Sequence, residues 1–95
     1  MWHLSDDGDV IDEVNRCPEQ IKVDFAEMLD QLVGNPRDPR LGVLRLADLS
    51  WPGEGYTVPF GPDDIGLLFY SLTSDIPTIR LQLIVWRGAM PLLRG

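Results

Sequence analysis

The sequence is poor in the features that usually mark disulfide-linked, membrane-spanning or histidine-dependent proteins. It has one cysteine, Cys17, and one histidine, His3, among 95 residues. A single cysteine excludes a disulfide within the chain and suits a reducing compartment, so we expect a cytoplasmic protein. No apolar run approaches the roughly 18 residues that cross a membrane, and the N-terminus lacks the basic and apolar regions of a signal peptide. We therefore expect no membrane partner.

The composition indicates one globular domain over residues 1–95. A hydrophobic content of 44% and a charged content of 24% are typical of a folded chain. The net charge of −7 is unevenly spread, because residues 1–35 hold nine acidic and two basic residues, whereas residues 36–95 hold six acidic residues and six arginines. A uniformly acidic protein repels nucleic acid. This chain confines its excess of acid to the first third.

The first third predicts a short strand and two helices. Residues 2–5 are a candidate strand, and residues 5–7 offer oxygens that cap the helix after them. Pro18 ends this short helix and suits the first turn of a second one. The second helix carries an apolar stripe made of Ile21, Phe25, Met28, Leu29 and Leu32. Residues 34–36 end it, so the two helices should form an αα-hairpin.

The remaining two thirds predict strands. Residues 56–60, 65–72 and 78–86 have the composition and alternation of strands, and Pro59, which lacks a ladder donor, places the first of them at an edge. In the last strand we expect one purely apolar face, made of Ile79, Leu81, Leu83 and Val85. The predicted fold class is α+β: an N-terminal strand and an αα-hairpin packed on an antiparallel β-meander, in the order β-α-α-β-β-β.

Four short motifs follow this order. They are "LDQLVGNP" at the end of the helix pair, "LRLADL", the hairpin "YTVPF…IGLLFY" and the closing "IVWRG". Together they resemble the RelE/ParE superfamily of bacterial toxin–antitoxin toxins over nearly the whole chain. Arg87 matches the arginine that ends the last strand in this superfamily, and Arg45 and Tyr70 match more loosely. The resemblance implies an antitoxin partner, and as cellular target either the ribosome with its mRNA or a topoisomerase.

The sequence departs from the superfamily where ribonuclease members carry their cations. The arginine usual before the central tyrosine is replaced by Gly66 and Leu67, and the basic positions of the preceding strand fall near Thr57 and Pro59. The common histidine before the final arginine is Trp86. The resemblance thus implies a toxin-like component that acts by binding protein, with weak or absent ribonuclease activity. An active ribosome-dependent mRNA endonuclease and a plain interaction domain stay open as alternatives.

Candidate site residues follow from this comparison and from side-chain chemistry. The candidate catalytic residues are Arg87, Tyr70 and Glu54, the last as a base for a ribose hydroxyl. The candidate binding residues are Arg45, Arg80, Arg87, Trp86 and Arg94, through charge or stacking. The alternative is that they are ordinary surface arginines and core aromatic residues. In a regular strand Arg80 and Arg87 lie on opposite faces, so a bulge or a strand end is needed to bring them together.

Three further expectations complete the sequence reading. No glycine-rich phosphate loop, metal-ligand spacing or catalytic triad is visible, so we expect no cofactor and no metal. Arg87 either pairs with an acid of the helix hairpin or stands free as an anion site. Residues 88–95 are a possible docking tail because they contain Met90, Leu92 and Leu93.

Overall fold

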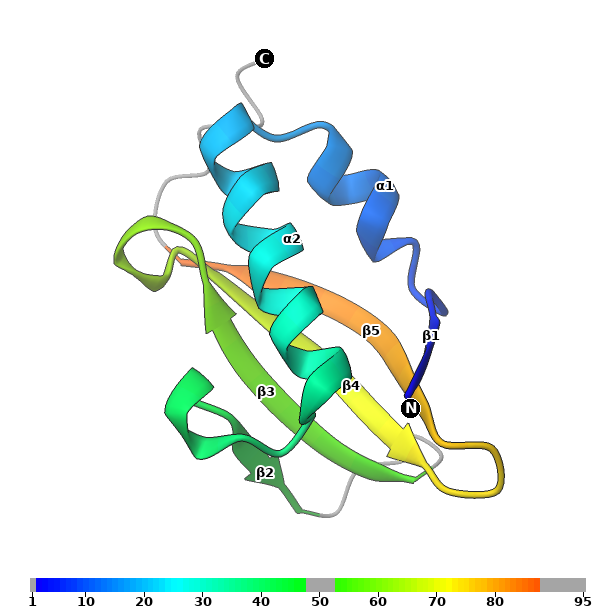
Figure 1. Cartoon of the computed structure of the whole chain (residues 1–95). Coiled ribbons are helices and arrows are strands. Elements are labelled where there is room, and N and C mark those ends of the chain that lie inside the picture. Colours follow the sequence, from blue (N-terminus) through cyan, green and yellow to red (C-terminus); the bar gives the residue numbers. More distant parts are fainter. Residues whose placement is uncertain (1, 48–52, 88–95) are drawn as a thin grey trace.

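A computed structural model describes residues 2–47 and 53–87 of the chain (Figure 1). The elements are, in order, β1 (His3–Ser5), α1 (Val10–Asn15), α2 (Glu19–Gly34), β2 (Leu44–Leu46), β3 (Glu54–Phe60), β4 (Gly66–Thr73) and β5 (Thr78–Trp86), with short 3-10 turns at Pro39–Leu41 and Pro62–Asp64. The predicted α+β class and the predicted order of elements are confirmed, and β2 is an additional strand. No described helix is long and apolar enough to cross a membrane.

The sheet is mixed, whereas the sequence predicted an antiparallel one. Its strand order is β1-β5-β4-β3-β2. All neighbours are antiparallel except β1 and β5, which run parallel with His3 opposite Thr78. Two helices and three strands separate β1 from β5 along the chain, so no tight hairpin imposes an antiparallel direction on this pair.

The extra strand changes the position of β3 in the sheet. β2 pairs with β3 from Leu44 opposite Thr57 to Leu46 opposite Gly55, so β3 is not an edge strand as predicted. The pairing with β2 does not extend past Thr57, and among the described strands Pro59 pairs with Leu67 of β4 alone. The missing ladder donor of Pro59 is tolerated because this half of β3 has a partner strand on one side only.

The helices begin and end where their sequences indicate. The carboxylate of Asp6 accepts hydrogen bonds from the backbone nitrogens of Val10 at 2.6 Å and Ile11 at 3.0 Å, which caps α1 as predicted. Helix α2 starts directly after Pro18. Its buried residues are Ile21, Phe25, Met28 and Leu32, while Leu29 is half-buried at the margin of the same stripe.

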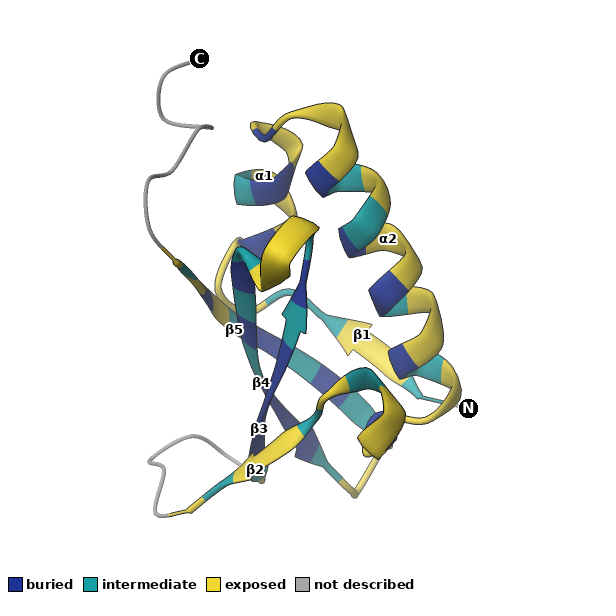
Figure 2. Ribbon diagram, turned by 90° about the vertical axis from the view of Figure 1, so that its left-hand side faces the viewer, coloured by how far each residue is buried: buried dark blue, intermediate teal, exposed yellow. Residues whose placement is uncertain are grey.

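The core lies between this helix stripe and one face of the sheet, and both helices lie on that same side (Figures 1 and 2). The sheet contributes Tyr56, Val58, Phe60, Leu68, Tyr70, Leu72, Ile79, Leu81 and Ile84. Phe25 of α2 packs edge-on against Phe60 with ring centroids 5.0 Å apart. Each fully buried side chain of this size contributes about 1.5–3 kcal/mol through removal from water.

A β-bulge in β5 reverses the predicted alternation of that strand. Phe69 pairs with Leu83 and Tyr70 pairs with Leu81, which leaves Gln82 without an opposite residue. Before the bulge Ile79 and Leu81 are buried as predicted, but after it Leu83 and Val85 are 40% and 45% exposed, while Ile84 is buried. The predicted apolar face is therefore wrong beyond Gln82, because one inserted residue shifts the period of two.

Gly8 occupies the space beside this bulge. Its backbone nitrogen donates to the carbonyl oxygen of Leu81 at 3.0 Å. A Cβ at position 8 would lie 2.6 Å from the carbonyl carbon of Gln82 and would overlap its oxygen. The chain between β1 and α1 thus approaches the bulge at a distance that only glycine allows.

On the face turned away from the helices, the half of the sheet near the pairing of Gly66 with Trp86 carries apolar side chains, whereas the other half carries Ser71, Thr73, Thr78 and Arg80. Phe60 contacts Phe25 of α2 and Trp86 contacts Glu13 of α1, so their neighbours Pro59 and Val85 point to the opposite side. We define the outer sheet face by Leu44, Pro59, Leu67, Leu83 and Val85, which the register places on this side.

Candidate functional site

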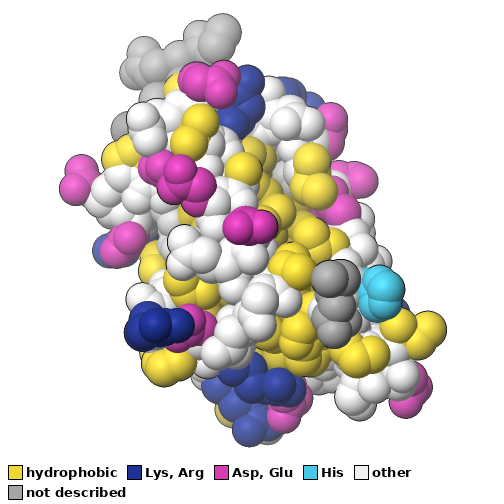
Figure 3. All heavy atoms as spheres, viewed as in Figure 1, with side chains coloured by type: hydrophobic (Ala, Val, Ile, Leu, Met, Phe, Trp, Pro, Cys, Tyr) yellow, Lys and Arg dark blue, Asp and Glu magenta, His cyan; other side chains and the backbone are white. Residues whose placement is uncertain are grey.

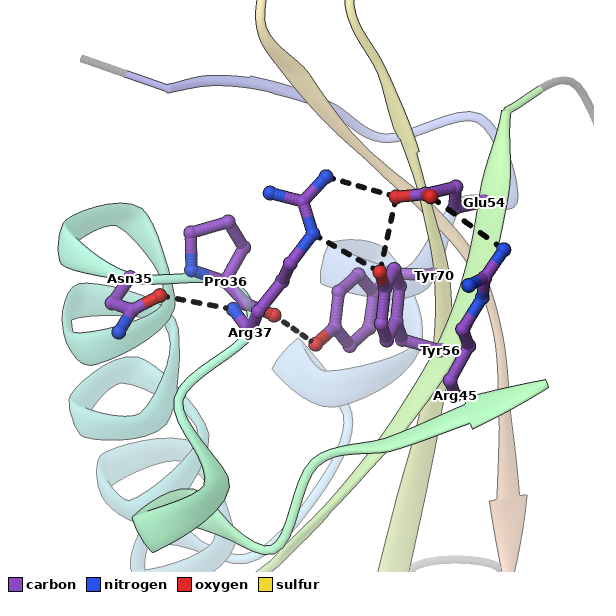
Figure 4. Close-up of polar contacts among 7 residues, drawn as sticks. All are labelled: Asn35, Pro36, Arg37, Arg45, Glu54, Tyr56 and Tyr70. Atoms are coloured by element: carbon purple, nitrogen blue, oxygen red, sulfur yellow. Dashed lines mark hydrogen bonds and ion pairs between the residues drawn. The ribbon is translucent and has the colours of Figure 1, made fainter.

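A connected polar cluster lies where the chain leaves α2 and meets strands β2 and β3 (Figure 4). The Nε of Arg37 donates to the hydroxyl of Tyr56 at 3.0 Å, and its Nη2 donates to Oε1 of Glu54 at 2.9 Å. The Tyr56 hydroxyl donates to the same Glu54 oxygen at 3.0 Å. Arg45 of β2 approaches the other oxygen of Glu54 at 3.5 Å. We call Arg37, Arg45, Glu54 and Tyr56 the Arg37 cluster.

Local sequence places Arg37 at this position. Pro36 cannot continue α2, and the side-chain oxygen of Asn35 accepts a hydrogen bond from the backbone nitrogen of Arg37 at 3.2 Å (Figure 4). The chain therefore turns toward the sheet immediately after the helix. Arg45 is directly opposite Tyr56 in the β2–β3 register, so both side chains lie on the helix side of the sheet.

Tyr56 and Tyr70 form a stacked pair that anchors the cluster. Their rings lie on neighbouring strands with centroids 5.7 Å apart and planes inclined by 20°. Tyr70 is fully buried, and its hydroxyl donates to the carbonyl oxygen of Pro36 at 2.6 Å. Burial raises the pKa of Tyr70 well above its ordinary value. The structure thus places this candidate catalytic residue in the core, where its uncharged hydroxyl connects the sheet to the end of α2 through a hydrogen bond.

The cluster keeps Glu54 in its charged form. The hydrogen bond from Arg37, and then the one from Tyr56, lower the pKa of Glu54. The hydrogen bonds that Arg37 donates to Glu54 and then to Tyr56 raise the pKa of Arg37. Glu54 accepts a proton only at the expense of these bonds, so it is a weak general base. Arg37 also lies over two aromatic rings, 5.6 Å from the Trp2 centroid and 5.9 Å from the Tyr56 centroid.

A cavity of about 470 Å³ opens beside the cluster. Its lining includes Trp2, Arg37, Glu54, Thr73 and Asp75. An aromatic ring, a guanidinium, two carboxylates and a hydroxyl suit a polar ligand, but they include no activated nucleophile. Among the described residues, no group of histidine, cysteine, aspartate and glutamate side chains is arranged to hold a metal ion.

Arg87 lies at the other end of the sheet from the Arg37 cluster. It follows β5 beside the pairing of Gly66 with Trp86, and its backbone nitrogen donates to Ile65 at 2.8 Å. It lines a pocket of about 430 Å³ with Pro18 and Ile21 of the helix hairpin. Its guanidinium forms no ion pair or hydrogen bond within the described parts of the chain. No described acid of the helix hairpin pairs with Arg87, and neither Tyr70 nor Arg45 is its neighbour, so its role as an anion site stays a prediction.

The other candidate binding residues have local partners. Trp86 donates from Nε1 to Glu13 at 2.5 Å and packs edge-on against Phe60, with centroids 5.7 Å apart. Arg80 contacts Asp7 at 3.3 Å and donates to Thr73 at 3.4 Å. The bulge required to place Arg80 and Arg87 on one face is present, but each has different neighbours at opposite ends of β5. Arg94 and the possible docking tail at residues 88–95 lie outside the described residues.

Sequence reasoning did not single out Arg37. Its only local signal is its place after Asn35 and Pro36, at the end of a predicted helix. Its partners Glu54 and Tyr56 lie two residues apart on β3, and Arg45 joins them through the pairing of β3 with β2, which was not predicted. Without β2, the sequence does not predict that Arg37 and Arg45 contact the carboxylate of the same residue, Glu54.

The positions at which the resemblance implies basic residues in ribonuclease members lie on both sides of the sheet. Thr57, Pro59 and Leu67 lie on the side turned away from the helices, whereas Gly66 pairs with Phe60 and Trp86, whose side chains contact the helices. None of these residues carries a charge. Uncharged side chains at these positions have no direct means to stabilise the charge that develops on a phosphate during cleavage.

Comparison with known proteins identifies the fold. Neither a family model nor a curated protein matches the sequence. Among solved structures, the chain is similar to one in the crystal structure of the archaeal RelE–RelB complex from Pyrococcus horikoshii OT3, with a TM-score of 0.75 and 18% identity. The match covers 92% of this chain and 96% of that chain. The chain described here therefore has a RelE-like toxin fold.

Proposed function

We propose that this chain is a member of the RelE/ParE superfamily and a toxin-like component of a toxin–antitoxin pair. It acts by binding protein, with weak or absent ribonuclease activity. The fold supports the superfamily, and the solved relative is a complex of RelE with RelB. We infer by analogy that an antitoxin binds this chain. The fold by itself does not specify the activity, which depends on the residues at the site.

The absence of charge at Thr57, Pro59 and Leu67 is the observation that favours binding over RNA cleavage. RNA cleavage requires a base, an acid and cations near the scissile phosphate. Among the candidate catalytic residues, Tyr70 is buried and Glu54 accepts a hydrogen bond from Arg37, so neither is placed to act as the base or the acid. His3 lies on the edge strand β1, away from both groups in the sheet order. Arg87 is exposed, and its guanidinium forms no ion pair or hydrogen bond with another of the residues that the structure describes.

Incubation of the purified protein with translating ribosomes and a defined mRNA, followed by primer extension, tests the ribonuclease half of this proposal. We expect no cleavage above background. The comparison set includes Arg87→Ala and the matched variant Arg16→Ala, which removes an arginine from an exposed pair with Asp12 on α1. Robust cleavage that Arg87→Ala abolishes and Arg16→Ala preserves would establish the endonuclease alternative instead.

The partner half of the proposal is tested with the product of the neighbouring gene. If that product is a small protein with a DNA-binding half, we expect the two purified proteins to form a stable complex in size-exclusion chromatography. We also expect expression of this chain alone to slow growth and coexpression to restore it. A soluble, folded chain that neither affects growth nor binds the product would favour the plain interaction domain.

A further inference from the structure

The pocket of about 430 Å³ beside Arg87 combines an apolar lining with two charged side chains of opposite sign. The start of α2 and the connection between β3 and β4 supply its apolar side chains, which are Pro18, Ile21, Pro62 and Ile65. The charged side chains are those of Asp63, in the same connection, and Arg87, after β5. Segments far apart in the sequence therefore build this pocket, and its volume falls within the range of small-molecule sites.

The two charged side chains of this pocket are not used to hold the fold together. Neither Asp63 nor Arg87 forms an ion pair or a hydrogen bond with another of the described residues, and they do not pair with each other. By contrast, every other lysine and arginine within residues 2–47 and 53–87 has a carboxylate partner. The pocket thus offers one positive and one negative group to a ligand.

Backbone contacts fix both charged residues before any ligand binds. Asp63 and Asp64 have φ angles of 54° and 53°, in the left-handed region that residues other than glycine seldom adopt. The backbone nitrogen of Asp64 donates to the carbonyl oxygen of Gly61 at 3.1 Å, which closes this turn. The backbone nitrogen of Arg87 donates to Ile65 of the same turn at 2.8 Å. Unusual backbone conformations of this kind concentrate at ligand sites, and a site fixed in advance loses less entropy on binding.

The lining groups select the chemistry of the ligand. The planar guanidinium of Arg87 suits a carboxylate, and the carboxylate of Asp63 suits an ammonium group. The apolar part of the lining favours an aliphatic body between these two charges. A ligand with negative charge alone would be repelled by Asp63, and a ligand with positive charge alone would be repelled by Arg87. A ligand that carries both charges satisfies both side chains.

We propose that this pocket binds a small zwitterion with an aliphatic body, either a free apolar amino acid or a short apolar peptide. Its carboxylate binds Arg87, its ammonium group binds Asp63, and its aliphatic part contacts Ile21 and Ile65. The inference goes beyond the proposed function, because this site requires neither an antitoxin nor RNA.

Five small molecules test the proposal by nuclear magnetic resonance titration of the full chain. Leucine and leucyl-leucine carry both charges and an aliphatic body, N-acetyl-leucine lacks the ammonium group, leucinamide lacks the carboxylate, and glycine lacks the body. We expect leucine or leucyl-leucine to bind about tenfold more tightly than each of the other three, with shifts at the methyl groups of Ile21 and Ile65. The tighter of the two identifies the ligand as an amino acid or a peptide.

Two variants assign each charge of the ligand to one side chain. Asp63→Asn, which keeps the shape of the side chain and tolerates the same backbone conformation, should abolish the preference for leucine over N-acetyl-leucine. Its control is Asp64→Asn, because Asp64 has the same backbone conformation and does not line the pocket. Arg87→Gln should abolish the preference for leucine over leucinamide, whereas the control Arg16→Gln, on the exposed face of α1, should preserve it.

Three outcomes would overturn the inference. The first is the absence of saturable binding of leucine and leucyl-leucine up to about 10 mM. The second is binding of N-acetyl-leucine or leucinamide as tight as that of leucine, because one charge would then suffice. The third is a set of shifts that leaves Ile21 and Ile65 unchanged. Growth, antitoxin binding and ribonuclease activity are measured separately, so failure of this inference is distinguishable from failure of the proposed function.

Discussion

Replacement of Gly8 by alanine tests the packing that holds the β1–α1 connection against the bulge of β5. The added Cβ would lie 2.6 Å from the carbonyl carbon of Gln82 and overlap its oxygen, whereas ordinary carbon–carbon contacts are about 3.5–4.0 Å long. Both groups belong to the backbone, so no flexible side chain can rotate away. Either the connection or the bulge has to move by about 1 Å.

The expected cost follows from two contributions. Overpacking that shifts backbone costs about 1–3 kcal/mol, and loss of the Gly8 hydrogen bond to Leu81 adds about 0.5–1.5 kcal/mol. We therefore expect Gly8→Ala to lower the free energy of unfolding by about 2–4 kcal/mol. Since about 1 kcal/mol corresponds to about 4–8 °C in Tm for a chain of this size, the expected decrease in Tm lies between about 8 and about 30 °C.

Urea unfolding followed by far-ultraviolet circular dichroism measures this difference. Gly34→Ala is the matched control, because Gly34 is exposed at the end of α2 and a Cβ there meets nothing within 4 Å. The control should gain stability by about 0.5–1 kcal/mol through helix propensity. If Gly8→Ala unfolds within about 0.5 kcal/mol of the parent while the control behaves as expected, the bulge does not depend on this close approach.

Three further predictions follow from the core and the Arg37 cluster. Phe25→Ala should lower the free energy of unfolding by about 3–5 kcal/mol because residue 25 is only 4% exposed, and Leu29→Ala should lower it by less because Leu29 is half-buried. Urea unfolding curves that rank the two variants in the opposite order would contradict this. Tyr70→Phe should cost about 1–3 kcal/mol in thermal melts because the carbonyl of Pro36 loses its donor, and an unchanged midpoint would show that the bond contributes nothing. The pKa of Glu54 is lowered in the folded state, so its contribution to stability is present above its unfolded pKa and is lost as the pH falls through the folded one. Stability of Glu54→Gln should therefore depend less on pH below about pH 4.3, and acid-unfolding curves that superimpose on those of the parent would refute the role of the carboxylate.

The elements that the sequence predicted correctly are those with a local periodic signal. The stripe from Ile21 to Leu32 repeats at helical spacing over three turns, so α2 and its buried face follow from the sequence. Asp6 caps α1 through an oxygen only a few residues away. β4 and β5 are long apolar strands separated by a short turn, a pattern that indicates a hairpin.

The features that the sequence did not reveal depend on contacts between distant segments. The bulge at Gln82 follows from the register of β5 against β4, and no residue type in "RLQLIV" marks it. β2 has only three residues, two of them exposed, so its pairing with β3 has little periodic pattern. Arg87 was singled out from the resemblance, and its role stays a prediction. Arg37 was missed because its partners are 17 and 19 residues away in the chain.

The parallel pairing of β1 with β5 has a consequence for the order of folding. His3 hydrogen-bonds through its backbone to Pro77, and Ser5 pairs with Arg80, so the first strand can join the sheet only after nearly all of the described chain has been synthesised. During synthesis the β3–β4 hairpin can form early, whereas β1 and the bulge contact of Gly8 must wait for β5. Contacts between such distant segments slow folding. We expect the closure of the β1 edge to be the late step.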